Sequence, residues 1–391
     1  MIAEMAMGVV LVIGAVLMVR SLWALQRIDL GFEPENVLTM KLMPPGFSYT
    51  PEQSVQLYQR LLERVRALPD VRKAGALRSL PLGNTIGDWG AEIEGYVETP
   101  GHAAKGDWQV LTAGASEAIG ERLVRGRLFA DADNSAQAQP VALINETMAR
   151  MYWAGRDPIG GRFRVGHGQP SRPWFTVVGI VANERHNGVD VRVKEKFYIT
   201  HAQWNMLGMN PIRAMTLVVK TGGDPLALAG PIRAIVRELD PNLPVANIRP
   251  MTDVVGTALA TPRFTGWLLA LFAMLALVLS AVGIYGVLAY LVSQRTHEIG
   301  IRLAMGAERP QVLRMVLGHG LALAMIGLFI GVGAAFFLTS LMAAQLHDIA
   351  PRDLTTFVGV PVLMTLVALA ASYIPAWRAT RVDPLIALRA Q

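Results

Sequence analysis

Three long stretches without a charged residue lie in the last third of the chain and constrain its fold more than any other feature. They span residues 264–292, 315–346 and 354–377, and none contains Asp, Glu, Lys or Arg. A helix needs about 20 residues to cross the roughly 30 Å hydrocarbon core of a bilayer, and each stretch is longer. Because backbone polar groups find no partner in lipid, such stretches must be helical. We therefore predict transmembrane helices at about 264–292, 316–342 and 354–377.

A fourth apolar stretch, at 5–25, opens the chain. One interpretation is a secretory signal peptide, but such a peptide starts with basic residues, and here Glu4 occupies that region. No small-residue cleavage site follows it either. We instead predict a first transmembrane helix over 1–26, in which Trp23 is an interfacial anchor and Arg20 extends its side chain outward to the headgroups.

Roughly 230 residues of mixed polarity separate the first apolar stretch from the other three. A segment of this length can bury one or two hydrophobic cores in water. The predicted fold class is therefore an α-helical membrane protein with four transmembrane helices, one before and three after a large extracytoplasmic α+β domain. We place this domain at 27–260 and the three-helix part at 261–391.

The predicted domain contains two similar strand–helix–strand patterns far apart in the sequence. In the first, Thr50 is a suitable N-cap and Gln53 completes a capping box. Together the patterns predict one split ferredoxin-like subdomain of βαβ type at about 37–80 and 212–250. The expected elements are a strand at 37–42, a helix from Pro51, strands at 71–77 and 214–220, a helix at 225–239 and a strand at 245–248.

A second subdomain, at about 81–211, is predicted to be inserted between the two patterns. Its apolar runs indicate strands at 141–144, 175–181 and 196–199. Asn145 is a good N-cap for a short helix after the first of these strands.

Arginine is distributed unevenly between the short connections, and this predicts the orientation of the chain. The segment 293–315 carries Arg295, Arg302, Arg309 and Arg314 against only two glutamates, and the tail after residue 377 is also basic. Short loops rich in Lys and Arg stay in the cytoplasm. We therefore predict that residues 27–260 lie outside the cytoplasm. In a bacterium with two membranes, this places the helices in the inner membrane and residues 27–260 in the periplasm.

Several kinds of chemistry are excluded by what the sequence lacks. There is no cysteine, and none of the six lysines follows a glycine, so a thiolate site and a Walker A motif are both ruled out. We predict no catalytic residue, no metal and no cofactor bound by this chain. His102, His167, His186 and His201 are interpreted as solvated surface residues rather than metal ligands. No dense basic run indicates nucleic-acid binding.

Small residues recur at helical spacing in two of the apolar stretches. Such residues let helix backbones approach closely in a membrane, although Gly and Ala are also frequent there by chance. The stretches contain no carboxylate, which argues against a proton-driven pump. The predicted packing positions are Ala273, Ala276, Ser280 and Gly283 in the first stretch and Gly327 and Gly331 in the second.

The segment 295–307 is predicted to form a short amphipathic helix on the cytoplasmic side, between two spans. Glu298 and Arg302 have the i, i+4 spacing of a stabilising ion pair. Gly306 suits the C-cap. Two interpretations remain open for this helix: it lies on the lipid headgroups, or it is a docking element for a partner protein.

These residues resemble a known family. The segment 295–307 resembles the R-x-x-E-I-G-I-R-x-A-x-G-A element of FtsX-like, MacB-type ABC transporter permeases, and 375–384 resembles the closing motif of that family. Within the predicted domain, 141–146, 157–160 and 175–181 resemble the MacB-like periplasmic core domain. The similar motifs occur in the same order over almost the full chain.

The resemblance implies a permease that dimerises, or pairs with a second permease half, and binds a cytoplasmic ABC ATPase. ATP would then be used by the partner subunit, and its motion would be relayed to the periplasmic domain by mechanotransmission, with a periplasmic adaptor as a further partner besides membrane lipid. The residues that would dock the ATPase are Glu298, Ile299, Gly300, Ile301, Arg302, Leu303, Met305 and Gly306.

The chain departs from the MacB archetype because it carries no ATPase motif of its own. Its opening, with 27–38, looks like one repeat unit of duplicated permeases of acidobacterial type, so it could be half of a longer permease. Export or efflux is the predicted function. The alternative is an FtsX-like signalling scaffold that controls a periplasmic enzyme without transporting a solute, and an enzymatic role of the domain itself has least support.

Overall fold

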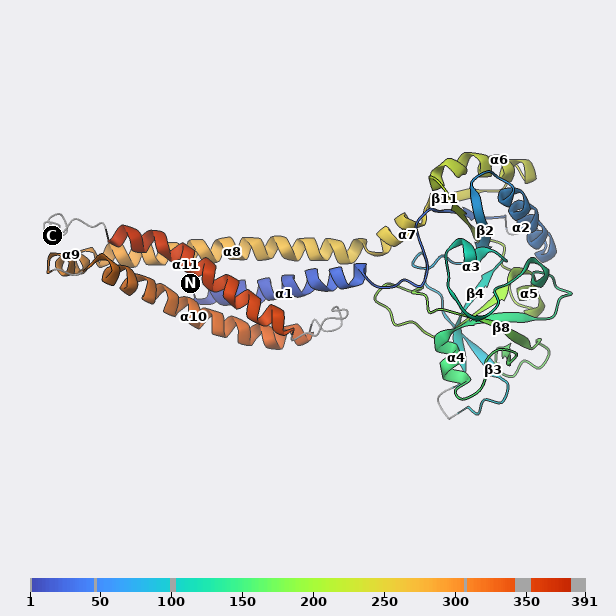
Figure 1. Ribbon diagram of the computed structural model, residues 1–391, viewed down its shortest axis with the longest axis horizontal. Coiled ribbons are helices and arrows are strands. Elements are labelled where there is room, and N and C mark those ends of the chain that lie inside the picture. The colour runs from blue at the N-terminus through green and yellow to red at the C-terminus, as the bar shows by residue number, and fades with distance from the viewer. Residues whose placement is uncertain (1, 46–47, 99–102, 306–307, 342–352, 381–391) are drawn as a thin grey trace. The chain divides into compact units, whose positions relative to one another are not determined.

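The structure is a computed structural model that describes residues 2–45, 48–98, 103–305, 308–341 and 353–380. The chain divides into two compact units (Figure 1). The helical unit consists of Met1–Ile28 and Thr261–Gln391, and the α+β unit consists of Asp29–Ala260.

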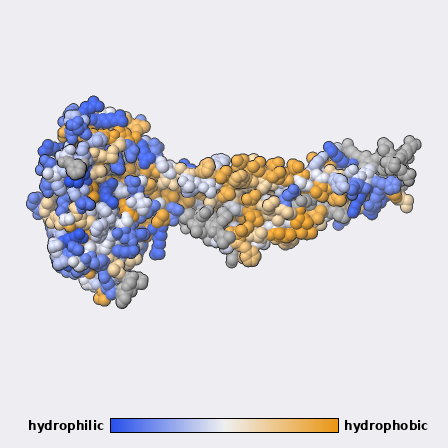
Figure 2. All heavy atoms as spheres, turned by 180° about the vertical axis from the view of Figure 1, so that it is seen from behind, coloured by the Kyte–Doolittle hydropathy of each residue, from blue (hydrophilic) through white to orange (hydrophobic). Residues whose placement is uncertain are grey.

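The helical unit contains long helices with apolar surfaces. Its elements are α1 (Ile2–Gln26), α8 (Ala260–Gln294), α9 (Thr296–Ala304), α10 (Arg309–Leu341) and α11 (Leu354–Ala379). Within the described residues, all of these except the short α9 are long and apolar enough to cross a membrane. Helices α1, α10 and α11 pack against one another. Figure 2 shows the hydrophobic surface of the helical unit.

Helix α10 begins earlier than the sequence predicted. A start at 316 was expected, but the helix begins at Arg309 and takes in part of the predicted connecting segment. Pro310 lies in its first turn, where N–H groups have no partner within the helix, so proline is tolerated. The carbonyl of Glu308 accepts hydrogen bonds from the N–H groups of Gln311 (3.0 Å) and Val312 (3.4 Å). The predicted end at 342 lies outside the described residues.

The two small residues predicted for packing on α10 lie against α1. A Cβ added to Gly327 would come within 2.8 Å of the Cβ of Met5, and one added to Gly331 would come within 2.7 Å of the Cβ of Val9. These distances are shorter than van der Waals contact between two carbon atoms allows. Glycine is therefore required for the close approach of these two helices.

Gly331→Leu is expected to destabilise the helical unit by about 1–3 kcal/mol, because the new side chain overpacks the contact with α1. Gly333→Leu is the matched control, since a Cβ at Gly333 meets nothing within 4 Å. Thermal unfolding of the full chain in detergent would measure both. Equal unfolding temperatures for the two variants would contradict the close approach.

Three of the four small residues predicted for packing on α8 lie toward α1, namely Ala276, Ser280 and Gly283. Ala273 and Ser280 are buried, while Ala276 and Gly283 are half-buried. The Ser280 hydroxyl donates to the carbonyl of Glu4 at 3.4 Å. The opposite side of α8 is broadly exposed, with large apolar side chains such as Trp267 and Val278.

Arg20 forms an ion pair within the helical unit, where the sequence predicted a side chain extended to the headgroups. Its guanidinium contacts the carboxylate of Asp353 and donates to the Thr356 hydroxyl at 3.2 Å. Asp353 is also the N-cap of α11 and accepts from the Thr356 N–H at 2.8 Å. A charge near lipid is stabilised by such a partner. The pair brings the end of α1 and the start of α11 together.

The α+β unit is built on one sheet, whose first part runs in the order β11-β1-β10-β2 with antiparallel neighbours. Two strand–helix–strand patterns interleave here, as in a split βαβ motif. The predicted capping box is confirmed, since Thr50 Oγ1 accepts from the N–H of Gln53 at 3.2 Å and Gln53 Oε1 accepts from the N–H of Thr50 at 2.8 Å. The elements are β1 (Val37–Leu42), α2 (Pro51–Arg66), β2 (Val71–Leu77), β10 (Met215–Thr221), η3 (Pro225–Leu228), α6 (Ala229–Leu239), β11 (Val245–Pro250) and α7 (Met251–Ala258).

The segment between β2 and β10 extends the same sheet. It joins the first part through one residue pair, Leu77 on β2 and Leu111 on β4. The predicted helix after Asn145 is confirmed, with Asn145 Oδ1 accepting from the Met148 N–H at 2.9 Å. The elements are β3 (Asp88–Ile93), β4 (Lys105–Leu111), α3 (Ala115–Ala118), β5 (Leu123–Gly126), η1 (Asp131–Asp133), β6 (Val141–Asn145), α4 (Glu146–Tyr152), β7 (Arg162–Val165), β8 (Phe175–Val181), β9 (Lys196–Thr200), α5 (His201–Trp204) and η2 (Asn205–Leu207).

Arg66, the last residue of α2, bonds to both parts of the α+β unit. Its Nε donates to the carbonyl of Ala74 at 3.1 Å, and its two terminal nitrogens bond to the carbonyl of Ala113 at 2.6 Å and to the carboxylate of Asp131 at 2.9 and 3.0 Å. One guanidinium therefore holds β2, the segment after β4 and η1 together.

Candidate functional site

Helix α9, between α8 and α10, has one buried and one exposed apolar face. The side chain of Ile299 is 1 % exposed and packs into the helical unit, while Ile301 is 41 % and Met305 84 % exposed. Ile301, and Met305 directly after the helix, therefore leave apolar surface that no described residue covers. The exposed face is therefore available to a partner, and the buried face fixes the helix on the spans that flank it.

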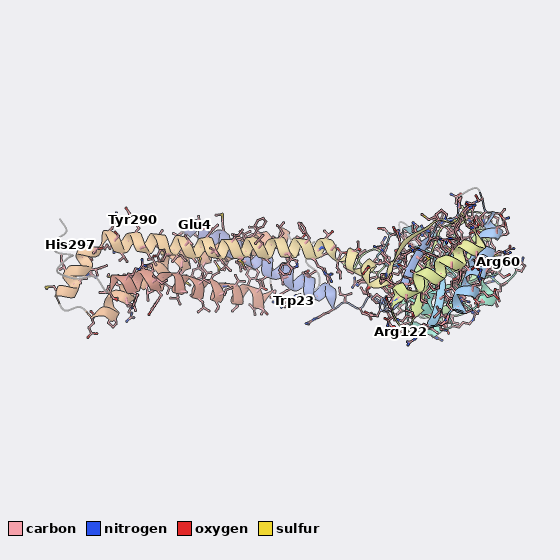
Figure 3. All side chains as sticks on the ribbon, turned by 90° about the horizontal axis from the view of Figure 1, so that it is seen from above. Glu4, Trp23, Arg60, Arg122, Tyr290 and His297 are labelled. Atoms are coloured by element: carbon pink, nitrogen blue, oxygen red, sulfur yellow. The ribbon has the colours of Figure 1, made fainter. Side chains whose placement is uncertain are left out.

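Charged side chains on α9 hold its shape. Arg302 donates to Glu298 at 2.6 Å across one helical turn, and its other terminal nitrogen lies 2.9 Å from the sulfur of Met315 on α10. Both charged side chains are about half exposed, so the ion pair contributes only about 0.2–0.5 kcal/mol. Figure 3 shows His297 and Tyr290 at this end of the helical unit.

The structure places most of the predicted docking residues on one helix, but not all of them lie on its exposed side. Glu298, Ile301, Arg302 and Met305 are exposed. Ile299 is buried, so it can support the helix but cannot touch a partner directly. The backbones of Gly300 and Leu303 belong to α9, whereas Gly306 lies outside the described residues.

A buried polar cluster in the α+β unit was missed by the sequence analysis. It consists of Glu121, Glu184, His186, Lys196 and Tyr198, all of them buried. Lys196 and Glu184 form an ion pair. The Nδ1 of His186 lies 3.1 Å from the Nζ of Lys196 and accepts its hydrogen bond, because an ammonium group can only donate.

Burial and neighbouring charges set the pKa values of the polar cluster. Burial, with the charge of Glu184 adding to it, raises the pKa of Glu121 to about 7. Burial would also raise the pKa of Glu184, but Lys196 and His186 beside it together outweigh burial and lower that pKa to about 2. Burial, assisted by Lys196, lowers the pKa of His186 to about 4. The cluster therefore holds a proton on Glu121 under mildly acidic conditions.

The interpretation of the histidines as solvated surface residues is wrong for two of them. His186 and His201 are buried, and the ring of His201 donates to the carbonyl of Ile212 at 2.7 Å. His167 is partly exposed and lies 3.5 Å from Glu98, and His102 lies outside the described residues. Within the part of the chain that the structure describes, no three His, Asp or Glu side chains are arranged to hold a metal ion.

No local pattern in the sequence predicts the polar cluster. Lys196 and Tyr198 alternate on β9 with apolar residues, which usually marks a strand with one solvated face. In the structure β9 lies between β4 and β6, and all five of its residues are buried. Only the pairing of β9 with strands on both sides shows that these polar groups are internal.

Four helices of membrane-spanning length in the described part of the chain and a separately folded α+β unit are the features of a polytopic membrane protein that carries a folded domain. Family models identify both units. The chain belongs to the family with a MacB-like periplasmic core domain, whose model matches residues 2–235, and the model of the FtsX-like permease C-terminal domain matches residues 270–384.

Curated relatives are MacB-type export permeases. The macrolide export ATP-binding/permease protein MacB 1 of Aeromonas hydrophila is 29% identical over 278 residues, which cover 69% of this chain and 41% of that protein. The probable syringafactin export ATP-binding/permease protein SyfD of Pseudomonas syringae pv. tomato is 27% identical over 272 residues, which cover 68% and 39%. The chain thus spans about two fifths of the length of these relatives.

Among solved structures, the periplasmic region of MacB from Actinobacillus actinomycetemcomitans is similar to this chain. It is 14% identical with a TM-score of 0.37, and the match covers 60% of this chain and 97% of that one.

Proposed function

We propose that this protein is the permease subunit of an ABC-type export or efflux system and relays ATP hydrolysis by a separate cytoplasmic ATPase to its periplasmic domain. The observation that carries the proposal is the two-faced helix α9, in a family whose relatives are named exporters. The partner ATPase would bind the nucleotide, so this chain would need no cofactor of its own.

In this mechanism each face of α9 has its own task. Ile301 and Met305 contact the ATPase, and the ion pair between Glu298 and Arg302 adds a small stabilisation to the helix. Ile299, packed into the helical unit, passes the displacement of α9 to α8 and α10. Motion would then be transmitted through helix packing, with no wide channel through the four helices.

Ile301→Asp is expected to reduce capture of the cytoplasmic ATPase by the full chain at least tenfold, since a charge replaces an apolar contact at the centre of the docking face. Leu123→Asp is the matched control, because Leu123 is 38 % exposed and lies in the α+β unit. A pull-down with quantitative mass spectrometry measures both. Equal capture by the two variants would contradict the docking assignment.

The proposed orientation places the basic end of the helical unit in the cytoplasm and residues 27–260 in the periplasm of a bacterial inner membrane. The chain has no cysteine, so single cysteines report sidedness without background. In intact spheroplasts, a membrane-impermeant maleimide should label Val97→Cys fully and Met305→Cys only after lysis, since both positions are highly exposed. The reverse pattern would overturn the orientation.

The proposed partners include a second copy or a second permease half. Helix α8 presents many large apolar side chains away from its own unit, and they could face lipid or another permease chain. They include Phe264, Trp267, Leu271, Met274, Val278 and Val282. A periplasmic adaptor would complete an efflux system. A signalling scaffold would dock the ATPase in the same way, and the two functions differ in whether reconstituted vesicles move a solute.

A further inference from the structure

An apolar groove lies where α9 folds against the two spans that flank it. It is small, with a cavity volume of about 40 Å³, so it can take a few methylene groups rather than a whole ligand. It is lined by residues of α8, α9 and α10, and all of them except one arginine are apolar. The lining residues are Leu288, Leu291, Val292, Arg295, Ile299, Met315 and Val316. Such a lining suits a hydrocarbon chain.

Arg295 is the one charged residue of the groove lining, and its side chain is exposed. Within the described residues its guanidinium forms no ion pair and no hydrogen bond, whereas the neighbouring Arg302 is paired with Glu298. Among the described residues, the positive charge beside the apolar groove has no counter-ion, so an external anion can pair with it. The polar end of the expected occupant is negatively charged.

The groove lies at the depth of the lipid headgroups. Trp267 and Tyr290 are both exposed on α8, and the rise of about 1.5 Å per residue places them about 35 Å apart along the helix axis. This separation matches the roughly 30 Å hydrocarbon core bounded by interfacial aromatic residues. Leu291 follows Tyr290 directly and Arg295 lies about one helical turn beyond Leu291, so the groove begins where hydrocarbon meets headgroup.

We infer that this groove binds one anionic phospholipid, with part of an acyl chain between α8 and α10 and the headgroup phosphate on Arg295. Basic pockets between membrane helices bind anionic headgroups for the same electrostatic reason. The alternative occupant, an apolar side chain of a partner protein, leaves the charge of Arg295 unmatched. Because Ile299 forms one wall of the groove, the bound lipid would pack against the buried face of α9. The exposed face of α9 would stay free.

Native mass spectrometry of the full chain, released from micelles that contain phosphatidylglycerol and phosphatidylethanolamine with identical acyl chains, tests this inference. We expect the wild type to retain phosphatidylglycerol about fivefold over phosphatidylethanolamine, as one favourable charge contact predicts. Arg295→Gln should remove the preference, and Leu291→Trp, which fills the groove, should abolish retention of both lipids. Arg314→Gln, which removes an equally exposed arginine outside the lining, should keep the fivefold preference.

Each outcome decides the matter. A loss of preference in Arg314→Gln as large as in Arg295→Gln would show diffuse attraction and overturn the site. If Leu291→Trp loses ATPase capture but retains lipid as the wild type does, the groove belongs to the protein partner. Arg295→Gln alters only an exposed side chain, so its result stands even if Leu291→Trp fails to fold. Lipid retention is measured without the ATPase, so it is independent of the proposed docking.

Discussion

Lys196→Met in the full chain is expected to lower the free energy of unfolding of the α+β unit by about 3–5 kcal/mol. The substitution leaves Glu184 as an uncompensated charge in the interior, and breaking a buried pair from one side has a cost of this size. The side chains of Lys196 and Glu184 are only 4 and 2 % exposed, so water cannot screen the remaining charge. Urea unfolding of the full chain in detergent, followed by tryptophan fluorescence, would measure the loss.

Two further variants separate this effect from a general loss of packing. Lys194→Met removes a lysine that is 45 % exposed and pairs with Asp88, and it should cost less than about 1 kcal/mol. The double variant Lys196→Met with Glu184→Leu should recover most of the stability, because no buried charge remains. A single Lys196→Met variant as stable as Lys194→Met would show that the pair is not buried.

Glu121→Gln is expected to change the pH dependence of stability. The pKa of Glu121 is raised from 4.5 to about 7 in the folded protein. Its contribution to the free energy of unfolding is therefore complete below about pH 4.5 and is lost as the pH rises through 7. His186 acts in the opposite direction, because its pKa is lowered from 6.5 to about 4. Its contribution is present above pH 6.5 and is lost as the pH falls through 4.

Between pH 4.5 and 6.5 the two groups oppose each other in the wild type. In Glu121→Gln the contribution of His186 remains, so stability should rise with pH in this window by up to about 1.4 kcal/mol per pH unit. In His186→Asn the contribution of Glu121 remains, so stability should fall with pH. Urea unfolding at a series of pH values gives both slopes. Slopes of the same sign in the two variants would contradict the assignment.

The elements that could be predicted from the sequence are those with a local signal. The long uncharged stretches, the capping box at Thr50 and the apolar runs of β1, β6 and β8 all carry their own pattern, and the structure contains each of them. Strands β3 and β5 were missed because charged residues and glycines interrupt them, and all four residues of β5 are exposed. Such strands form only because neighbouring strands pair with them.

The candidate site shows the same division. The amphipathic pattern of α9 and its ion pair are local, so the sequence predicted the helix. Which of its apolar residues turns inward is decided by α8 and α10, and this is why Ile299 was grouped with Ile301 and Met305. The polar cluster and the partner of Arg20 depend on residues distant in the sequence, and no spacing rule connects them.

The single pair between Leu77 and Leu111 determines how the α+β unit can respond to force. Adjacent ladders, such as β1 with β10, share any load over six residue pairs, whereas β2 and β4 meet at one. The strand ladder is therefore shortest along this line, which two flanking backbone hydrogen bonds and the hydrogen bonds of Arg66 also cross. Because one hydrophobic core continues from one side of this line to the other, a pull on β1 would reach the strands beyond it mainly through side-chain packing.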